Sequence, residues 1–232
     1  MKAGEPGQPE IAVIVPTWNE AAQLPACLDA VGGGDAAVEV IVADGGSTDR
    51  TAEIARAWGA RVVAAPVRQR AAQMNLAAAG ARGRVLVFLH ADTRLPAGWV
   101  AELAGALDRD PGLVGGAFRR RFDDPSWWLR FTCVLADWRG RHWGCFLGDQ
   151  VIWVRADAFR ALGGFPPLDR CEDLEFSLRL ARAGRTAVLP ATVLSSARRF
   201  ARHGPVGQTW RDLVTVVRFL VQRPRKGNAS GL

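Results

Sequence analysis

The chain has 232 residues, of which 49% are hydrophobic and 23% are charged. This length suits one large domain, and the composition argues against a disordered tail protein, a collagen-like repeat or a coiled coil. The formal net charge of +7 comes almost entirely from arginine and favours a partner with negative charge, such as phosphates, nucleic acid or an anionic membrane face.

The first part of the chain alternates short hydrophobic strands with helices of similar spacing. After a lead-in over residues 1–10 that is expected to be disordered, the predicted strands and helices are, in chain order, 11–15, 20–31, 38–43, 51–58, 61–64, 69–81, 84–89 and 97–107. Such alternation indicates βαβ units and a parallel sheet. We therefore expect residues 11–112 to form a nucleotide-binding half.

The second part of the chain, after residue 112, has a different order. Strands are expected over 114–122, 150–155 and 186–189, and helices over 156–162 and 171–183. No linker separates the two parts, so residues 113–205 are predicted to be a second half of the same domain. Residues 206–232 are predicted to form an amphipathic helix with a basic tail, which either packs on the domain or lies on an anionic membrane.

An aromatic and basic segment spans residues 126–146 and contains four tryptophans. Tryptophan and arginine interleaved in this way either stack on sugars, bind single-stranded nucleic acid, or form buried core with surface charges. We favour core, with one or two aromatic side chains at an acceptor site.

The chain has no uncharged run of the roughly 18 apolar residues that a membrane-spanning helix needs. The polar start of the chain lacks the apolar segment of a secretory signal. The four cysteines are widely spaced and match neither a zinc pattern nor a disulfide framework. A soluble, cytoplasmic protein is therefore expected, with peripheral contact at the inner face of the cell membrane as an open alternative.

Polar residues follow three of the predicted strands at their carboxyl ends. Thr17 and Glu20 follow the first strand, residues 44–49 follow the second, and Asp92 follows the fourth. Because the carboxyl ends of parallel strands line the ligand crevice of an open sheet, these residues predict one convergent site. The alternative is that they are turn and helix-cap residues, positions that Asp, Ser and Thr favour.

Two common nucleotide-binding patterns are absent from the sequence. A dinucleotide-binding domain needs G-x-G-x-x-G between the first strand and helix, where this chain has PTWNE. A Walker loop needs a Gly-Lys pair, which the chain lacks. A nucleotidyltransferase would need a glycine- and lysine-rich loop at the same place, so PTWNE argues against that class too.

Four motifs in fixed order resemble the inverting glycosyltransferases of family 2, which have the GT-A fold: IVPTWNE, VIVADGGSTDRTAEIA, FLHADTRLP, and GGF followed by CEDLEFSLRLARAGR. The resemblance runs from about Ile11 to about Arg185. It implies that residues 11–112 are the nucleotide-sugar-binding half and that residues 113–205 are the acceptor-binding half. It implies an α/β, Rossmann-like single domain with a mostly parallel central sheet flanked by helices. It also implies an enzyme that moves a sugar from a nucleotide-diphosphate sugar to an acceptor hydroxyl, with no nucleic acid partner.

Three further segments, RQRAAQMNLAAAGARG, GDQVIWVR and SSARRFARHG, resemble a narrower bacterial subgroup associated with radical-SAM or selenium-related proteins. The substrates of that subgroup are not generally defined, so this likeness adds little about chemistry.

The resemblance implies a donor site at the strand ends. Pro16, Thr17 and Glu20 would line the base and ribose pocket, and Asp44 would hydrogen-bond the base. Arg70 resembles a basic residue near the nucleotide, although a solvated helix face is the alternative. The further donor-nucleotide candidates are Ser47, Asn75 and Ala91.

Asp92 is the candidate metal ligand. The family usually has Asp-x-Asp here, and this chain has His90-Ala91-Asp92, so the first carboxylate is missing. A carboxylate suits Mg²⁺ or Mn²⁺, and such an ion would neutralise the charge of the diphosphate leaving group. His90 either contacts the sugar or ribose or packs at the strand end.

Asp173 is the candidate general base that deprotonates the acceptor hydroxyl, and Glu172 is its neighbour. Both begin a predicted helix, whose N-terminal dipole stabilises a carboxylate, while the adjacent charges raise one of the two pKa values. The alternative is that both are ordinary acidic residues at a helix start.

Other contacts are predicted more loosely. Asp149 is a candidate contact to the donor sugar or acceptor, and Arg198, Arg199 and His203 either cover the donor diphosphate or form a solvated turn. The chain lacks the Gln-x-x-Arg-Trp motif of processive synthases, so polymer export is not expected. The alternative function is a catalytically degenerate GT-A-like domain that binds nucleotide or nucleic acid through its basic surface. If membrane contact occurs, it would fit a lipid-linked acceptor.

Overall fold

The computed structural model describes residues 10–32, 38–201 and 203–222. The chain forms two compact units, Met1–Ser196 and Ala197–Leu232, and each is described by itself. The predicted lead-in, apart from Glu10, and the predicted basic tail lie outside the described residues.

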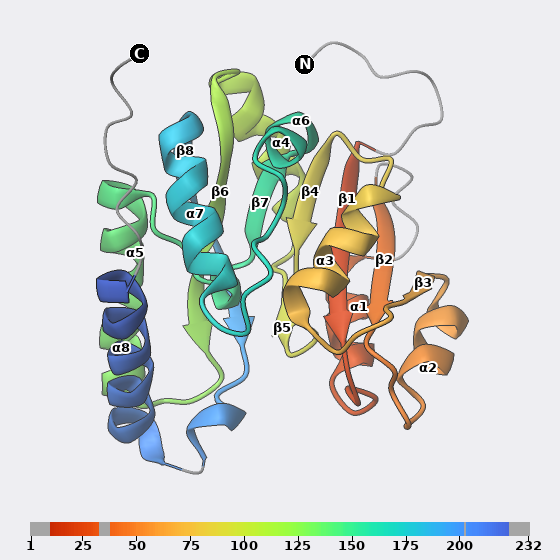
Figure 1. Cartoon of the computed structure of the whole chain (residues 1–232), viewed down its shortest axis with the longest axis horizontal. Coiled ribbons are helices and arrows are strands. Elements are labelled where there is room, and N and C mark those ends of the chain that lie inside the picture. The colour runs from red at the N-terminus through yellow and green to blue at the C-terminus, as the bar shows by residue number, and fades with distance from the viewer. Residues whose placement is uncertain (1–9, 33–37, 202, 223–232) are drawn as a thin grey trace. The chain divides into compact units, whose positions relative to one another are not determined.

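Within the described part of the larger unit, one eight-stranded sheet has the order β3-β2-β1-β4-β7-β6-β8-β5 (Figure 1). Its strands are β1 (Ile11–Thr17), β2 (Val38–Asp44), β3 (Arg61–Ala64), β4 (Val85–Phe88), β5 (Thr93–Arg94), β6 (Leu113–Phe122), β7 (Ile152–Arg155) and β8 (Arg185–Ser195). The helices are α1 (Leu24–Val31), α2 (Thr51–Trp58), α3 (Arg70–Ala79), α4 (Trp99–Arg109), α5 (Trp127–Trp143), η1 (Gly148–Gln150), α6 (Ala156–Ala161) and α7 (Glu172–Ala183).

The predicted α/β fold is confirmed, and the sheet has two differently built halves. In the first half β1 pairs in parallel with β2 and β4, and β2 pairs in parallel with β3. In the second half β7 is antiparallel to both β4 and β6, β6 is parallel to β8, and β5 is antiparallel to β8. The sheet is therefore mixed, because β7 returns beside β6 in the opposite direction after α5.

The core explains why the first strand is a run of apolar residues. Ile11, Val13 and Val15 belong to a buried cluster with α1 and α4. Ala12 and Ile14 belong to a second cluster with α3, α6 and α7. Because successive side chains of a strand point to opposite faces, a strand with helices on both faces is apolar at every position.

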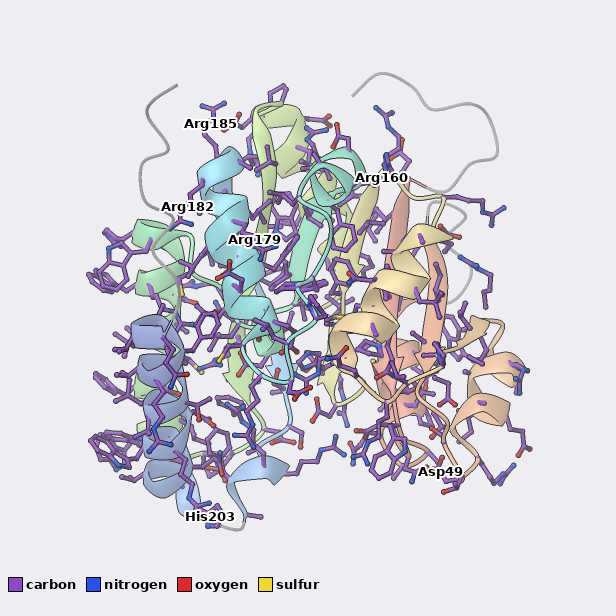
Figure 2. The ribbon with its side chains drawn as sticks, in the orientation of Figure 1. Asp49, Arg160, Arg179, Arg182, Arg185 and His203 are labelled. Carbon is purple, nitrogen blue, oxygen red and sulfur yellow. The ribbon has the colours of Figure 1, made fainter. Side chains whose placement is uncertain are left out.

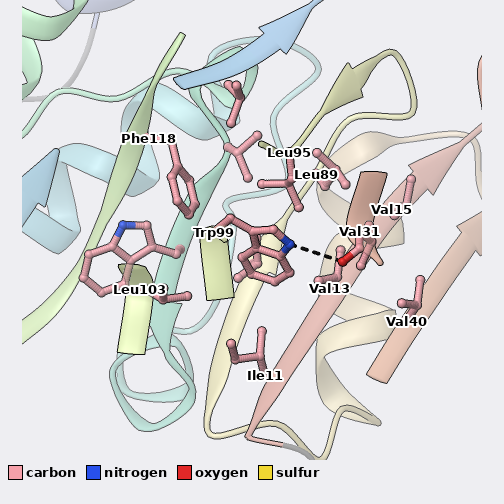
Figure 3. Packing of buried hydrophobic residues seen from close by; sticks show 14 of the residues in the cluster. Ile11, Val13, Val15, Val31, Val40, Leu89, Leu95, Trp99, Leu103 and Phe118 are labelled. Carbon is pink, nitrogen blue, oxygen red and sulfur yellow. Dashed lines mark hydrogen bonds between the residues drawn. The ribbon is translucent and has the colours of Figure 1, made fainter. Parts of the chain in front are cut away.

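The cluster on the α1 and α4 face is drawn in Figure 3. The indole N–H of Trp99, at the start of α4, donates to the carbonyl of Val31 at 3.2 Å. This bond joins the two helices that cover one face of the sheet.

The aromatic segment predicted over 126–146 forms one long helix, α5, and the prediction that its tryptophans are mainly core is wrong. Trp127, Trp138 and Trp143 are all exposed. The buried positions of α5 are instead small or medium-sized residues at helical spacing: Leu129, Cys133, Ala136 and Gly140. Tryptophan content alone is therefore no guide to which face of this helix is covered.

The smaller unit contains η2 (Arg198–Phe200) and α8 (Gly204–Gln222), close to the predicted helix over 206–222. None of the described residues of α8 is buried. Inside this unit Arg199 Nη2 lies 3.3 Å from Asp212 Oδ2. Among the helices that the structure describes, none has both the length and the apolar character to cross a bilayer.

Candidate active site

The loops that follow β1 and β2 are joined by hydrogen bonds from one to the other. The Asn19 N–H donates to Ser47 Oγ at 2.9 Å, and Asn19 Oδ1 accepts the Thr48 N–H at 2.8 Å. Asp49, which Figure 2 shows beyond the carboxyl end of β2, accepts the Ala21 N–H at 3.1 Å. Asn19 has a φ of 54°, a left-handed conformation that asparagine tolerates better than most residues. The PTWNE and GGSTD motifs thus form one continuous rim at the carboxyl ends of β1 and β2, which we call the edge around Asp44.

Asp44 is the polar centre of this edge. It is 7% exposed. Its carboxylate accepts hydrogen bonds from Thr17 Oγ1 at 3.2 Å, the Gly46 N–H at 3.2 Å, the Ser47 N–H at 2.9 Å and Ser47 Oγ at 2.5 Å. The predicted residues Thr17, Asp44 and Ser47 therefore lie together. A contact from Asp44 to a nucleotide base would require the Ser47 hydroxyl to turn away.

Two residues of this edge were not predicted from the sequence. The buried Gln73 of α3 donates from Nε2 to the carbonyls of Thr17 and Ala43, both at 2.8 Å. The guanidinium carbon of Arg68 lies 3.0 Å from the ring centroid of Trp18. A single glutamine in an alanine-rich helix gives no sign in the sequence that Gln73 belongs to the site. Trp18 could have been noticed, because it lies inside the PTWNE motif.

A second group of polar residues lies where α7 begins. We call this hollow the Asp173 pocket; it is lined by Arg70, Met74, Phe88, His90, Gly148, Ile152, Phe165, Glu172 and Asp173. Four of the predicted site residues therefore meet here, although they come from α3, the end of β4 and the start of α7.

Asp173 is held by backbone donors. Its Oδ2 accepts the Gly148 N–H at 2.6 Å, and its Oδ1 accepts the Leu174 N–H at 2.7 Å. Loss of hydration in the protein interior raises the pKa of Asp173 above its ordinary value, and the Gly148 N–H opposes that rise. A carboxyl with a raised pKa is a better proton acceptor when ionised, which is what a general base needs.

Glu172 differs from its neighbour because it has a cationic partner. It is 3% exposed, and its Oε1 lies 3.1 Å from Arg70 Nη1. Burial first, and then the charge of Asp173, raise the pKa of Glu172, while Arg70 lowers it. Arg70 thus touches the acidic pair directly, and Asp173 is the member of the pair without a salt bridge among the contacts described.

Gly148 occupies the space between two predicted site residues. A Cβ at this position would lie 2.6 Å from His90 Nε2 and 3.3 Å from Asp173 Oδ2. Because no side chain fits there, glycine allows the η1 backbone to pass between them and to donate to Asp173. Sequence reasoning noted the Gly148-Asp149-Gln150 segment but missed this role.

Asp149 is engaged with a buried arginine. Arg120 of β6, which is 8% exposed, forms an ion pair with the Asp149 carboxylate. Ser195 Oγ donates to the Asp149 carbonyl at 3.0 Å. These contacts fix η1, and with it the N–H that reaches Asp173. The predicted contact from Asp149 to sugar or acceptor stays a prediction.

Asp92 belongs to a neighbouring hollow, which we call the Asp92 pocket. It is lined by Gln23, Cys27, Ala91, Asp92, Arg94, Asp123, Leu194 and Ser196. Cys27 Sγ donates to the His90 carbonyl at 3.5 Å. Burial, and then the charge of Asp92, raise the pKa of this thiol to about 12, so it stays neutral.

The donors in the Asp92 pocket suit a hard cation that takes other ligands from a substrate. Asp92 and Asp123 supply carboxylate oxygens, the ligands that Mg²⁺ and Mn²⁺ prefer. Within the described ranges no group of three or more His, Cys, Asp and Glu residues is arranged to hold a metal. The residues therefore fit an ion that is completed by phosphate oxygens and water.

The remaining predicted residues lie in several places. Asn75 donates to the Phe165 carbonyl at 2.8 Å and accepts the Phe165 N–H at 2.9 Å, so its amide holds the GGF segment. Pro16 is the second-last residue of β1, and the Glu20 N–H donates to Thr51 Oγ1 at 2.8 Å. Three of the predicted site residues, Arg198, Arg199 and His203, lie in the smaller unit. The nucleotide contacts predicted for all of these stay predictions.

Comparisons with known sequences point to one family. Residues 12–157 match the family model described as Glycosyl transferase family 2. An uncharacterized glycosyltransferase of Mycobacterium tuberculosis (strain ATCC 25618 / H37Rv) is 33% identical over 178 residues, which cover 75% of this chain and 80% of the relative. A PGL/p-HBAD biosynthesis glycosyltransferase of the same strain is 38% identical over 96 residues, 38% of this chain and 37% of the relative.

Solved structures share the fold. A mannosyltransferase from Pyrobaculum calidifontis, in complex with GDP-Man and Mn²⁺, superposes with a TM-score of 0.73 at 25% identity and covers 94% of this chain. This chain spans 66% of that protein. Glucosyl-3-phosphoglycerate synthase from Mycobacterium tuberculosis, in complex with Mn²⁺, UDP and glucosyl-3-phosphoglycerate, has a TM-score of 0.65 at 23% identity, with 95% of this chain and 82% of that chain covered.

Proposed function

The chain belongs to glycosyl transferase family 2 and is a glycosyltransferase, and from this premise we propose that it is a metal-dependent, inverting enzyme that transfers a sugar from a nucleotide-diphosphate sugar to an acceptor hydroxyl. The observation that carries the proposal is the Asp173 pocket. It combines a carboxyl of raised pKa, held by the Gly148 N–H, with a neighbouring carboxyl held by Arg70.

In the proposed reaction Asp173 accepts the proton of the acceptor hydroxyl. The acceptor oxygen then forms a bond to the anomeric carbon as the bond from that carbon to the diphosphate oxygen breaks. A single direct displacement of this kind inverts the configuration at the anomeric carbon. Arg70 holds Glu172 in place and favours its ionised form, which opposes the rise in the pKa of Glu172 caused by burial and by the charge of Asp173.

Asp92 is the residue that would hold the metal, with Asp123 beside it. A divalent cation bound there would supply Lewis-acid stabilisation of the negative charge on the departing diphosphate. The mannosyltransferase and the glucosyl-3-phosphoglycerate synthase named above are both complexes with Mn²⁺, which supports a divalent metal here. The choice between Mg²⁺ and Mn²⁺ is left to measurement.

The edge around Asp44 would receive the nucleotide. It has the loop motifs of the family, and hydrogen bonds join its loops to each other. UDP and GDP-Man are named in the complexes of the two structural neighbours, so uridine and guanosine donors head the list to be tested. Thr17, Asp44 and Ser47 are the residues we expect to contact the base and ribose.

Three finer parts of the proposal rest on the sequence. A lipid-linked acceptor, peripheral contact with a membrane and the likeness to the subgroup associated with radical-SAM or selenium-related proteins all stay predictions.

The test is a thermal-shift series with UDP, GDP, ADP and CMP, each with and without Mn²⁺ or Mg²⁺. A ligand that binds only the folded chain raises Tm, and at a concentration of 100 times Kd it stabilises by about 2.7 kcal/mol. We expect one nucleotide to raise Tm in a metal-dependent manner, and Asp92→Asn to remove the metal-dependent part. The matching donor sugar is then incubated with the enzyme, and release of the nucleoside diphosphate is followed.

Two outcomes would contradict the proposal. A nucleotide that binds without any turnover of its sugar donors would favour the degenerate domain, for which the missing carboxylate at position 90 is the supporting observation. Turnover that is unchanged in Asp92→Asn would remove Asp92 from the metal site.

A further inference from the structure

Helix α5 has two apolar faces, and only one of them is covered by the fold. Leu129, Cys133 and Ala136 are buried, and α5 contacts β6 and β8. At Gly140 a Cβ would lie 2.8 Å from Val188 Cγ2, so glycine allows the helix to approach β8 closely. These contacts explain the inner face and leave the outer one to be accounted for.

The outer face is what we call the aromatic face of α5. Trp127 is 72% exposed and Val134 68% exposed, and Trp143 just beyond them is 62% exposed. The full set is Trp127, Phe131, Val134, Leu135, Trp138 and Trp143. The spacing of the first five is that of one helix stripe, and the helix is about 25 Å long at ~1.5 Å per residue. An apolar surface of this extent usually marks an interaction site.

The exposed charged side chains of α5 are those of Arg130 and Arg141, both positive, and His142 is exposed beside Arg141. The single carboxylate of α5, Asp137, is paired with Arg119 of β6, with Nε and Oδ2 2.6 Å apart.

Two aspartates precede the helix. Asp124 Oδ1 accepts the Ser126 N–H at 2.8 Å, and Asp123 lines the Asp92 pocket. Both have contacts of their own at the helix start, so the aromatic face itself is bordered by arginine.

We propose that the aromatic face of α5 docks on the surface of a bilayer that contains anionic lipid. Tryptophan is enriched where membrane meets water, because its ring is apolar and its N–H is polar. Helices that lie in this interface pair such residues with basic ones, and the basic ones attract anionic headgroups. A second copy of the chain is the weaker match, because two copies of this face would bring arginines against arginines.

The docked helix would also be coupled to the Asp173 pocket. Arg139 of α5 donates from Nε to the Cys145 carbonyl at 3.1 Å and from Nη2 to Gln150 Oε1 at 3.3 Å, and Gln150 ends η1. An enzyme bound through α5 would thus hold η1, and the candidate base, at a fixed position relative to the lipid surface. That the acceptor hydroxyl belongs to a lipid is an inference that rests on the proposed function. The binding of the chain to vesicles does not depend on that function.

The experiment is co-sedimentation of the full chain with vesicles of phosphatidylcholine, alone or mixed with phosphatidylglycerol. The test variant is the triple change Trp127→Ser, Phe131→Ser, Val134→Ser. The matched control is Trp210→Ser, Leu213→Ser, Val217→Ser on α8, which removes three exposed apolar side chains of the same kinds. We expect the wild type to bind the mixed vesicles, the α5 variant to bind on the order of tenfold more weakly, and the α8 variant to keep at least half of the binding.

A second variant covers the case in which the triple change impairs folding. Arg130→Glu combined with Arg141→Glu changes only exposed charges and should abolish the preference for phosphatidylglycerol. Asp173→Asn should bind vesicles as the wild type does, so that failure of the proposed reaction is told apart from failure of docking.

Three results would overturn the inference. The first is a folded wild type that binds neither kind of vesicle. The second is an α5 variant that binds as tightly as the wild type. The third is a wild type that forms dimers by light scattering, with dimerisation lost in the α5 variant and no vesicle binding, which would assign the face to a second copy.

Discussion

The edge around Asp44 and the Asp173 pocket both contain buried carboxyl groups at helix or strand ends. The two regions differ in how many hydrogen bonds each carboxylate accepts. Asp44 accepts four hydrogen bonds, two of them from backbone N–H groups and two from hydroxyls. Asp173 accepts two from backbone N–H groups and lies beside a second carboxyl. The first carboxylate is fully satisfied by the fold, and the second is not.

We infer from this difference that Asp44 mainly stabilises the fold, whereas Asp173 is available to accept a proton. Hydrogen bonds to an ionised carboxylate stabilise that form, and buried acceptors that lose them cost folding free energy. Desolvation of Asp173 acts the other way and raises its pKa. We therefore expect changes at Asp44 to reduce stability, and changes at Asp173 to reduce activity without reducing stability.

The largest expected effect is that of Asp173→Asn. Loss of a general base typically lowers the rate by ~10²–10⁴-fold. Because the pKa of Asp173 is raised in the folded chain, the ionised form costs folding free energy at neutral pH, a cost that the neutral amide avoids. The amide has one oxygen, so it can accept the N–H of Gly148 or of Leu174 but not both, and the variant loses one hydrogen bond. We expect these effects to offset, so that Tm of the variant stays close to that of the wild type at neutral pH and falls below it as pH falls. A variant that melts earlier and still turns over donor would reverse the comparison.

Gly148→Ala should come next. The added Cβ would lie 2.6 Å from His90 Nε2, so either His90 or the η1 backbone must move. We expect kcat/KM to fall by roughly 10–100-fold and stability by about 1–3 kcal/mol, the usual cost of overpacking. The control is Gly105→Ala in α4, where the nearest neighbour outside the helix backbone is the flexible end of Arg109 at 3.4 Å. Equal effects in both variants would deny any special role for position 148.

Asp44→Ala tests the other region. It leaves the Gly46 and Ser47 N–H groups and the Thr17 hydroxyl without their acceptor, which should lower the free energy of unfolding by about 1–3 kcal/mol. Urea unfolding followed by circular dichroism measures this. Ser47→Ala removes one of the donors and should cost less. If Asp44→Ala were as stable as the wild type, the edge would not depend on this carboxylate.

The smallest effect is a shift in pH dependence caused by Arg70→Gln. Arg70 lowers the pKa of both Asp173 and Glu172, so removing its charge should raise both. The base must be deprotonated to act, so activity is lost as pH falls through the raised pKa. The acid limb of kcat/KM against pH should lie above the ordinary aspartate range in the wild type and move to higher pH in the variant. Arg82→Gln, which removes an arginine whose side chain is 70% exposed and paired with Glu39, serves as control.

The first half of the fold could be predicted because each signal there is local. Strands buried on both faces are continuous apolar runs, and glycines end several helices, so β1, β2, β4 and α2 fell close to their predicted positions. In the second half, β8 extends over Arg185–Ser195 and pairs with β5, a two-residue strand. Pairing between segments about a hundred residues apart leaves no periodic pattern in either segment.

The candidate site also has one part that the sequence indicated and one part that only the structure shows. Resemblance to the family's motifs identified Asp44, Asp92 and Asp173 as candidates. The residues that hold the backbone and side chains around them could not be found in this way. Gln73 and Arg120 act through tertiary contacts with the carbonyls and carboxylates of other elements. Their neighbours in sequence carry no trace of those contacts.

The segment His90-Ala91-Asp92 borders both pockets, with His90 lining one and Ala91 and Asp92 the other. Ala91 is 4% exposed, so the backbone between them has no room to adjust one side alone. A substitution that reshapes the donor side of this segment should then disturb the acceptor side as well, and double changes across it should not be additive. An enzyme of this design acquires new donor or acceptor preferences most easily through the surrounding loops, while the segment between the pockets changes as a unit.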